Sequence, residues 1–139
     1  MSSRGLPAYV LDSYALLALL GEEACASKVQ AVLAKGVAGR AVVFLSIINY
    51  GEVLYIVERR RGLEAARTAA AFIDRLPVHV LEADRRLTFA AAHIKARFAV
   101  SYADAFAVAL AQAHNAHVVT GDPEFRRTES LAPVEWLAR

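Results

Sequence analysis

The sequence predicts a single α/β domain over residues 1–139, a three-layer α/β/α sandwich with a mainly parallel central sheet. Three observations lead to this fold class. Short β-rich runs alternate with longer helical stretches along the chain. These β-rich runs are apolar throughout rather than at every second residue, which is typical of strands covered on both faces. The 139 residues, 57% of them hydrophobic, are enough for one well-packed core and too few for two ordinary domains.

Five segments are expected to be strands because they are short, apolar and rich in β-branched residues. They are residues 8–12 (AYVLD), 41–46 (AVVFLS), 78–82 (VHVLE), 117–122 (HVVTGD) and 134–137 (VEWL). Helical crossovers between strands imply parallel pairing with right-handed connections.

The segments between the strands are expected to be helices because they are rich in Ala, Leu, Arg and Glu. They are residues 13–20, 24–35, 47–61, 63–76, 83–98 and 102–113. Helix ends are expected at Gly21, Gly36, Gly62, Pro77 and Asn115, and the expected N-caps are Ser13, Ser46 and Ser101.

Composition limits the classes of function. The formal net charge of +2 gives no polybasic footprint over the whole chain, although arginines occur in short runs such as ERRRG at residues 58–62. Cys25 is the only cysteine, which excludes an intramolecular disulfide and a cysteine-based zinc cluster. The N-terminus lacks the pattern of a signal peptide, and no run reaches the ~20 apolar residues of a membrane span. We therefore expect a cytoplasmic protein without a membrane partner.

The most informative feature is a set of carboxylates isolated from any cation. Asp12 is the only charged residue between Arg4 and Glu22. Glu52 stands alone in the same way between Arg40 and Glu58, and Asp104 between Arg97 and Asp122. Asp12 and Asp122 end predicted strands, so both are expected at the carboxyl edge of the sheet, where ligands of such folds gather.

Two of these acids fit an ordinary surface position poorly. Glu52 has Ile48 and Ile56 at the i−4 and i+4 positions, and Asp104 has Val100 and Val108 at the same spacing. Buried carboxylates without a partner are costly and repel one another when they converge. A positive group is therefore expected among them.

That positive group is expected to be Mg²⁺ or Mn²⁺. The four histidines, His79, His93, His114 and His117, form no zinc-binding pattern and are read as structural. A set of ligands made only of carboxylate oxygens suits a hard divalent cation. Such cations commonly act on phosphates, so metal-dependent phosphodiester cleavage is the first hypothesis.

Four ordered motifs, YVLDSYALLALL, LSIINYGEVLY, VSYADAFAVALAQ and VVTGDPEF, closely resemble those of the PIN-domain ribonucleases, in particular the VapC-type toxins of toxin–antitoxin pairs. The resemblance extends from Tyr9 to Phe125. It implies an endoribonuclease that cleaves RNA phosphodiester bonds with metal-activated water. The acids of the family fall on Asp12, Glu52, Asp104 and Asp122, which are the residues already distinguished by their isolation.

The resemblance also suggests supporting residues and partners. Ser13 and Thr120 are candidates for orienting metal-bound water or a carboxylate, with an N-cap role for Ser13 and a strand role for Thr120 as the alternatives. Asn49 is expected to face the site, and Ser101 is expected to cap the helix that carries Asp104. Arg97, Arg126 and Arg127 are candidates for contacts to the RNA backbone. The expected protein partners are a second copy of the chain in a homodimer and a small antitoxin. The apolar stretches LYIVERRRG and ALLALL are candidate contact surfaces, with core packing as the alternative.

Other functions stay open at this point. One is a PIN-domain nuclease that processes RNA and is not a toxin, and another is a PIN-like binding module without catalysis. A third is a Mg²⁺-dependent phosphoacceptor receiver domain, which is also a small α/β fold with Asp at strand ends. A receiver is expected to use a Lys near its last strands, whereas the last lysine here is Lys95, and it offers no role for Glu52.

Overall fold

A computed structural model describes residues 5–137 of the chain. Five parallel strands form one sheet in the order β3-β2-β1-β4-β5, which confirms the predicted fold class. The strands are β1 (Ala8–Leu11), β2 (Val42–Ser46), β3 (His79–Leu81), β4 (His117–Thr120) and β5 (Val134–Trp136). All five predicted strands are present, each within one or two residues of the expected ends.

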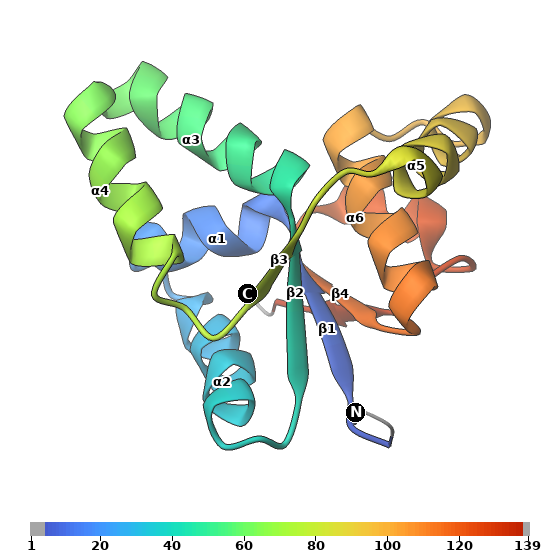
Figure 1. Ribbon diagram of the computed structural model, residues 1–139, viewed down its shortest axis with the longest axis horizontal. Coiled ribbons are helices and arrows are strands. Elements are labelled where there is room, and N and C mark those ends of the chain that lie inside the picture. The colour runs from blue at the N-terminus through green and yellow to red at the C-terminus, as the bar shows by residue number, and fades with distance from the viewer. Residues whose placement is uncertain (1–4, 138–139) are drawn as a thin grey trace.

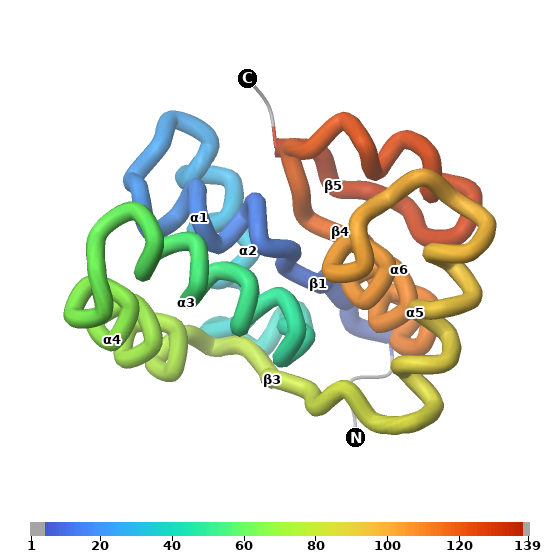
Figure 2. Tube along the Cα trace, turned by 90° about the horizontal axis from the view of Figure 1, so that it is seen from above, coloured from blue at the N-terminus to red at the C-terminus, as the bar shows by residue number. Residues whose placement is uncertain are grey.

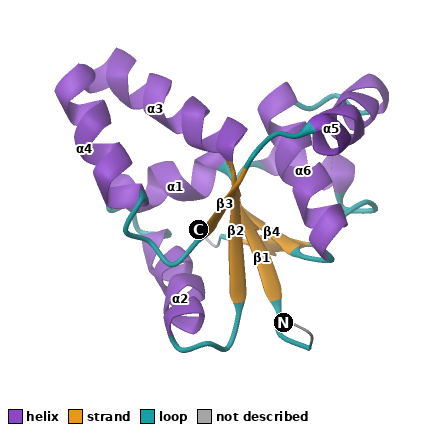
Figure 3. Cartoon of the chain, viewed as in Figure 1, coloured by secondary structure: helices purple, strands orange, loops and turns teal. Residues whose placement is uncertain are grey.

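Helices cover both faces of the sheet (Figure 1). One face is covered by α1 (Ser13–Leu20), α2 (Ala26–Val37), α3 (Ile47–Arg61) and α4 (Leu63–Ile73). The other face is covered by α5 (Arg85–Arg97), α6 (Tyr102–His114) and the short 3₁₀ helix η1 (Pro123–Thr128). Figure 2 shows the two groups of helices separated by the strands, and Figure 3 shows the same arrangement coloured by secondary structure.

The apolar strands are explained by the two cores that they separate. In β1, Tyr9 and Leu11 pack into the core under α1 to α4, whereas Val10 packs into the core under α5 and α6. Val10 and Leu11 are fully buried. A strand covered on both faces has no solvent side, and so it is apolar at successive residues.

The strand order creates a topological switch point beside β1. From β1 the chain moves outward to β2 and β3, and then crosses back to place β4 on the other side of β1. Loops leaving the carboxyl ends of β1 and β4 consequently diverge to opposite faces, which is the usual position of a ligand site in open parallel sheets. Asp12 follows β1 and Asp122 lies two residues beyond β4.

Three local expectations were wrong. Helix α2 does not stop at Gly36 but continues to Val37, because the positive φ that ends this segment falls at Gly39. Helix α4 ends at Ile73 rather than just before Pro77, because Arg75 and Leu76 make tighter i→i−3 hydrogen bonds. Ser13 is not the N-cap of α1. That position belongs to Asp12, whose carboxylate accepts a hydrogen bond from the backbone N–H of Ala15.

The other two caps were predicted correctly, since Ser46 is the N-cap of α3 and Ser101 is the N-cap of α6. Among residues 5–137 no helix combines the length and apolar character needed to cross a membrane.

Candidate metal centre at the carboxyl edge of the sheet

Asp12 is fixed between β1 and β4 by its own backbone and side chain. Its N–H donates to the carbonyl oxygen of Val119 at 3.4 Å, and its carboxylate accepts from the N–H of Ala15 at 2.8 Å. The side chain is 1% exposed. Because it caps α1, Asp12 has a fixed orientation at the switch point between β1 and β4.

The turn after β4 links Asp12 to Asp122. The hydroxyl oxygen of Thr120 accepts a hydrogen bond from the backbone N–H of Asp122 at 3.0 Å, and the Thr120 side chain is also hydrogen-bonded to the carboxylate of Asp12. Asp122 in turn caps η1 by accepting from the N–H of Glu124 at 2.9 Å. Thr120 therefore lies between two of the candidate acids and orients both.

Asp104 reaches the same edge from the opposite face. It lies in the first turn of α6, where its backbone N–H donates to the hydroxyl of Ser101 at 3.1 Å. The residue is 8% exposed although it is charged. The sequence expectation that Asp104 avoids solvent is confirmed.

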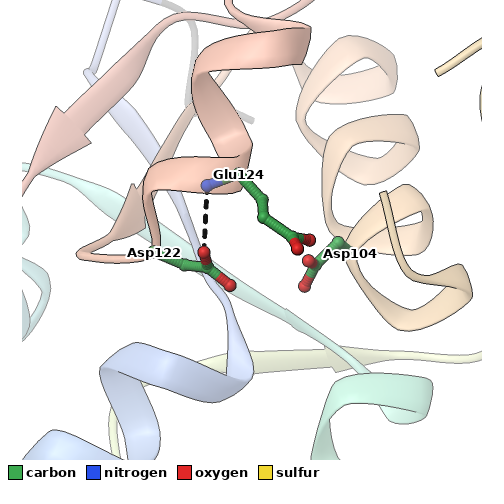
Figure 4. Close-up of side chains that lie close together, drawn as sticks. All are labelled: Asp104, Asp122 and Glu124. Carbon is green, nitrogen blue, oxygen red and sulfur yellow. Dashed lines mark hydrogen bonds between the residues drawn. The ribbon is translucent and has the colours of Figure 1, made fainter. Parts of the chain in front are cut away.

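Three carboxylates converge at this point. One oxygen of each of Asp104, Asp122 and Glu124 lies within 4.8 Å of the others, and Figure 4 shows Asp104 and Glu124 pointing toward each other beside Asp122. Glu124 was not predicted from the sequence. The available signal was its position two residues after Asp122 in GDPEF, where the tight 3₁₀ turn returns it toward the acid that caps the turn.

Glu52 belongs to a separate, hydrogen-bonded part of the site. Its carboxylate accepts from the hydroxyl of Ser13 at 2.5 Å, and the Ser13 oxygen accepts from the amide Nδ2 of Asn49 at 3.1 Å. The same amide donates to the carbonyl oxygen of Ala103 at 3.4 Å. Asn49 is fully buried, and its Oδ1 is a buried acceptor without a hydrogen-bond partner. Asn49 thus connects α1, α3 and the start of α6.

Burial is the main cause of the electrostatics of the site. It raises the pKa of Asp12 to about 8 against the lowering effect of the Thr120 and Ala15 hydrogen bonds, and the charges of Asp104 and Asp122 raise it further. Burial also raises the pKa of Asp104 to about 7, with the charge of Asp122 as the next cause and smaller contributions from Glu52 and Glu124. The four predicted acids therefore influence one another, although the tightest group contains only two of them.

Comparison with protein-family models gives a match to the PIN domain over residues 9–131, most of the chain. The chain belongs to the PIN domain family. Comparison with curated proteins gives no significant match. The family match sets aside the receiver alternative.

Solved structures share this PIN fold at low sequence identity. VapBC2 of Rickettsia felis, bound to a DNA fragment from its promoter, superposes with a TM-score of 0.75 at 17% identity, covering 94% of this chain and 99% of that one. DNA-bound VapBC of Salmonella typhimurium gives 0.73 at 19% identity, covering 96% and 100%. VapC20 of Mycobacterium tuberculosis, described as a toxin that cleaves the sarcin-ricin loop, gives 0.70 at 22% identity, covering 86% and 94%.

The donor set of this PIN domain fits Mg²⁺ or Mn²⁺. Carboxylate oxygens of Asp104, on α6, and of Asp122 and Glu124, at the start of η1, lie within 4.8 Å of one another, and hard divalent cations take such ligands. Within residues 5–137 neither Asp12 nor Asp104 has an ion-pair partner, and burial raises the pKa of both. None of the four histidines belongs to the group, and all four are exposed.

The three candidate arginines differ in their surroundings. The guanidinium of Arg126 lies 4.7 Å from the ring centre of Trp136, and that of Arg97 lies 5.1 Å from the ring centre of Phe98. Only Arg127 reaches the acidic group, with Nη1 3.8 Å from Glu124 and 2.7 Å from the carbonyl oxygen of Ala99.

Proposed function

We propose that this PIN domain is a Mg²⁺- or Mn²⁺-dependent endoribonuclease and the toxin of a toxin–antitoxin pair. The observation that carries the proposal is the convergence of Asp104, Asp122 and Glu124 beside the buried Asp12, at the sheet edge where parallel folds bind ligands. RNA as the substrate also places the proposed site of action in the cytoplasm.

In this proposal, Asp12, Asp104 and Asp122 hold the cation directly or through water, and Glu52 completes the site or positions the attacking water. Glu124 is added to the set because its carboxylate lies within 4.8 Å of Asp104 and Asp122. When bound, the divalent cation neutralises charge on the phosphodiester and lowers the pKa of a bound water. Whether one or two ions bind is tested by the stoichiometry of Mn²⁺ titration.

The supporting residues act by holding carboxylates in place. The Ser13 hydroxyl donates to Glu52, so Ser13 is proposed to fix the direction of that carboxylate. Thr120 is proposed to act on Asp12 through its side chain, and on Asp122 by accepting a hydrogen bond from the backbone N–H that holds the turn. Asn49 holds Ser13 and the first turn of α6 together, and Ser101 caps the helix that carries Asp104.

The exposed arginines are proposed to contact the RNA backbone. Arg127 is the best placed, because its contact with Glu124 puts its guanidinium beside the acidic group. Arg97 and Arg126 lie on exposed surfaces of α5 and η1. Replacing each with Gln is expected to weaken RNA binding and to reduce its dependence on salt concentration.

The decisive experiment maps RNA ends. The purified wild-type chain is incubated with total RNA and Mn²⁺, and the new ends are sequenced beside an Asp12→Asn control and an EDTA control. We expect discrete cleavage sites in the wild-type sample alone. Equal cleavage by a folded Asp12→Asn variant would contradict the assignment. The toxin role is separated from a processing role by growth arrest on expression and by rescue with the product of an adjacent small gene.

A groove supports the proposed antitoxin partner. It has a volume of about 580 Å³ and lies between α1, α3 and α4, with Leu17, Leu20, Val57 and Phe72 among its apolar lining residues and Arg60 and Arg61 at its side. These residues come from the two apolar stretches noted in the sequence and from α4. The similar structures from Rickettsia felis and Salmonella typhimurium are of VapBC, a family of toxin–antitoxin systems. We propose that a segment of a cognate antitoxin occupies this groove.

A Val57→Asp substitution is expected to abolish antitoxin binding in a pull-down while RNA cleavage is retained. The proposed homodimer is tested separately, by light scattering of the isolated chain. A monomer at micromolar concentration would count against the dimer.

A further inference from the structure

Tyr14 packs against the glycine that precedes Asp122. It lies in the first turn of α1, where its neighbours Ser13 and Ala15 are buried but Tyr14 itself is 39% exposed. A Cβ added to Gly121 would lie only 2.5 Å from Cε1 and 2.8 Å from Cζ of the Tyr14 ring. Gly121 does not have a positive φ, so a larger residue at this position would meet the Tyr14 ring and not a strained backbone.

The contact places the ring at the rim of the acidic site. Gly121 separates Thr120, which is hydrogen-bonded to Asp12, from Asp122, which belongs to the convergent carboxylates. Tyr14 itself follows Asp12 by two residues. The ring therefore rests on the turn after β4, between Thr120 and Asp122. Among the hydrogen bonds of the described residues, none involves the Tyr14 hydroxyl.

A partly exposed ring here supplies a contact that charge alone does not. The proposed cation and Arg127 attract the phosphates of an RNA strand without distinguishing one phosphate from the next, so charge at this point does not fix the position of the strand. Stacking of a base on an aromatic ring involves no net charge and is available to every nucleobase in an unpaired strand. A ring supported by the protein backbone on one side loses little freedom when a base covers its other side.

We propose that Tyr14 stacks on a nucleobase next to the cleaved bond of single-stranded RNA and so positions the scissile phosphate at the carboxylates. This inference rests on the proposed ribonuclease function and adds the contact that orients its substrate. The substrate class that fits is RNA with unpaired bases, since a base within a duplex does not offer its face.

The test measures whether the effect of removing one base of the substrate depends on the Tyr14 side chain. A pool of random single-stranded RNA oligonucleotides is cleaved by the wild-type chain in Mn²⁺, and the sites are mapped. One cleaved oligonucleotide is then made with an abasic nucleotide on either side of the cut. We expect one of the two abasic changes to raise KM roughly ten- to 100-fold in the wild-type chain.

Tyr14→Ala is expected to raise KM for the intact oligonucleotide by a similar factor, and the same abasic change is then expected to have no further effect. Tyr14→Phe and Tyr14→Trp retain a stacking face and are expected to keep KM close to that of the wild type. Phe89→Ala removes another exposed ring, on α5, and is the matched control in which the abasic effect persists.

A Gly121→Ala variant moves the ring without removing it. Because the added Cβ meets the outer atoms of the Tyr14 ring, the ring has to swing away. We expect this variant to show the raised KM of Tyr14→Ala. Mn²⁺ affinity, measured by calorimetry without RNA, is expected to be unchanged in every variant.

The outcomes separate this inference from the proposed function. If the wild-type chain cleaves no RNA in Mn²⁺, the proposed function fails and the inference fails with it. If the wild-type chain cleaves but the abasic effect persists in Tyr14→Ala, only the stacking role is overturned. If Tyr14→Ala instead weakens Mn²⁺ binding and leaves the abasic effect intact, the ring merely supports the Asp122 turn, and the inference is wrong.

Discussion

The two parts of the acidic site differ in how their carboxylates are compensated. Glu52 accepts a hydrogen bond from Ser13, which is held by Asn49, so neutral groups compensate this carboxylate. Asp104 and Asp122 face each other and Glu124, and within residues 5–137 neither Asp has an ion-pair partner. We therefore propose that the carboxylates around Asp104, the cation-requiring part of the site, need a cation, whereas the Glu52 part is held by its hydrogen bonds.

The largest expected effect on RNA cleavage comes from removing one negative charge from the cation-requiring part of the site. Asp104→Asn keeps the shape of the side chain but removes a charge that the proposed cation needs. We expect RNA cleavage to fall by at least about 10²–10³-fold, the scale seen when a major charge-stabilising group is lost. Without metal the variant is expected to be at least as stable as the wild type, because repulsion from Asp122 disappears. Cleavage assays and thermal denaturation in EDTA measure the two quantities.

Ser13→Ala perturbs the other part of the site. The substitution removes the donor to Glu52 and leaves the Asn49 amide without one of its acceptors. We expect cleavage to fall by about 10–100-fold, as for other residues that orient a metal-site carboxylate. Stability is expected to fall by about 1–3 kcal/mol because buried polar groups lose partners.

Mn²⁺ affinity separates these two variants. It is expected to fall sharply in Asp104→Asn and to stay closer to that of the wild type in Ser13→Ala. If both variants lose Mn²⁺ binding equally, the distinction between the two parts of the site is wrong.

Stability as a function of pH gives a third test. The folded-state pKa values of Asp12 and Asp104, about 8 and about 7, exceed the ordinary value of 3.8. The folded state then keeps protons that the unfolded state releases, so without metal the free energy of unfolding falls as the pH rises from about 4 to about 8.

Addition of Mg²⁺ or Mn²⁺ is expected to oppose this loss, by about 2.7 kcal/mol at a concentration 100 times the Kd. The gain should shrink toward pH 5, where protons compete for the carboxylates. Denaturant unfolding in EDTA and in Mg²⁺ across this pH range measures both effects. A metal-free stability that rises between pH 5 and pH 8 would contradict the raised pKa values.

Much of the fold could be predicted because local sequence signals, such as caps and helix-ending glycines, favour the same helices and strands that tertiary packing stabilises. The ends of α3 were predicted correctly, since Ser46 offers a cap and Gly62 adopts a φ of 96° that other residues avoid. Gly36 misled because it does not adopt the positive φ that ends this segment, which falls three residues later at Gly39. Asp12 was recognised as an acid of the site, but its second role as the cap of α1 was assigned to Ser13.

The candidate site could be predicted only to the level of its isolated charges. Asp104 was found because it has no charged neighbour in the sequence, and Asp122 because it ends a predicted strand, and the structure brings both into one group. Glu124 was missed because it neither ends a strand nor stands apart from charged residues. The contact between Tyr14 and Gly121 joins segments more than 100 residues apart, and no local pattern indicates it.

The smallest expected effect concerns Glu124 and Arg127 at the outer edge of the cation-requiring part. Both side chains are about half exposed and their charged atoms are 3.8 Å apart, so solvent screens the pair. Glu124→Gln removes an outer ligand and should weaken Mn²⁺ binding, whereas Arg127→Gln removes a competing cation and should strengthen it. Each change is expected to be within about fivefold, since exposed pairs contribute about 0.2–1 kcal/mol.

The matched control for this pair is Arg67→Gln, because Arg67 and Glu64 form an exposed pair at the same i,i+3 spacing on α4. It should leave Mn²⁺ affinity unchanged. If Arg127→Gln weakens Mn²⁺ binding instead, Arg127 supports the cluster through its hydrogen bond to Ala99 rather than competing with the cation. A Glu124→Gln effect as large as that of Asp104→Asn would place Glu124 among the principal ligands and would move the centre of the site outward, from the sheet edge onto η1.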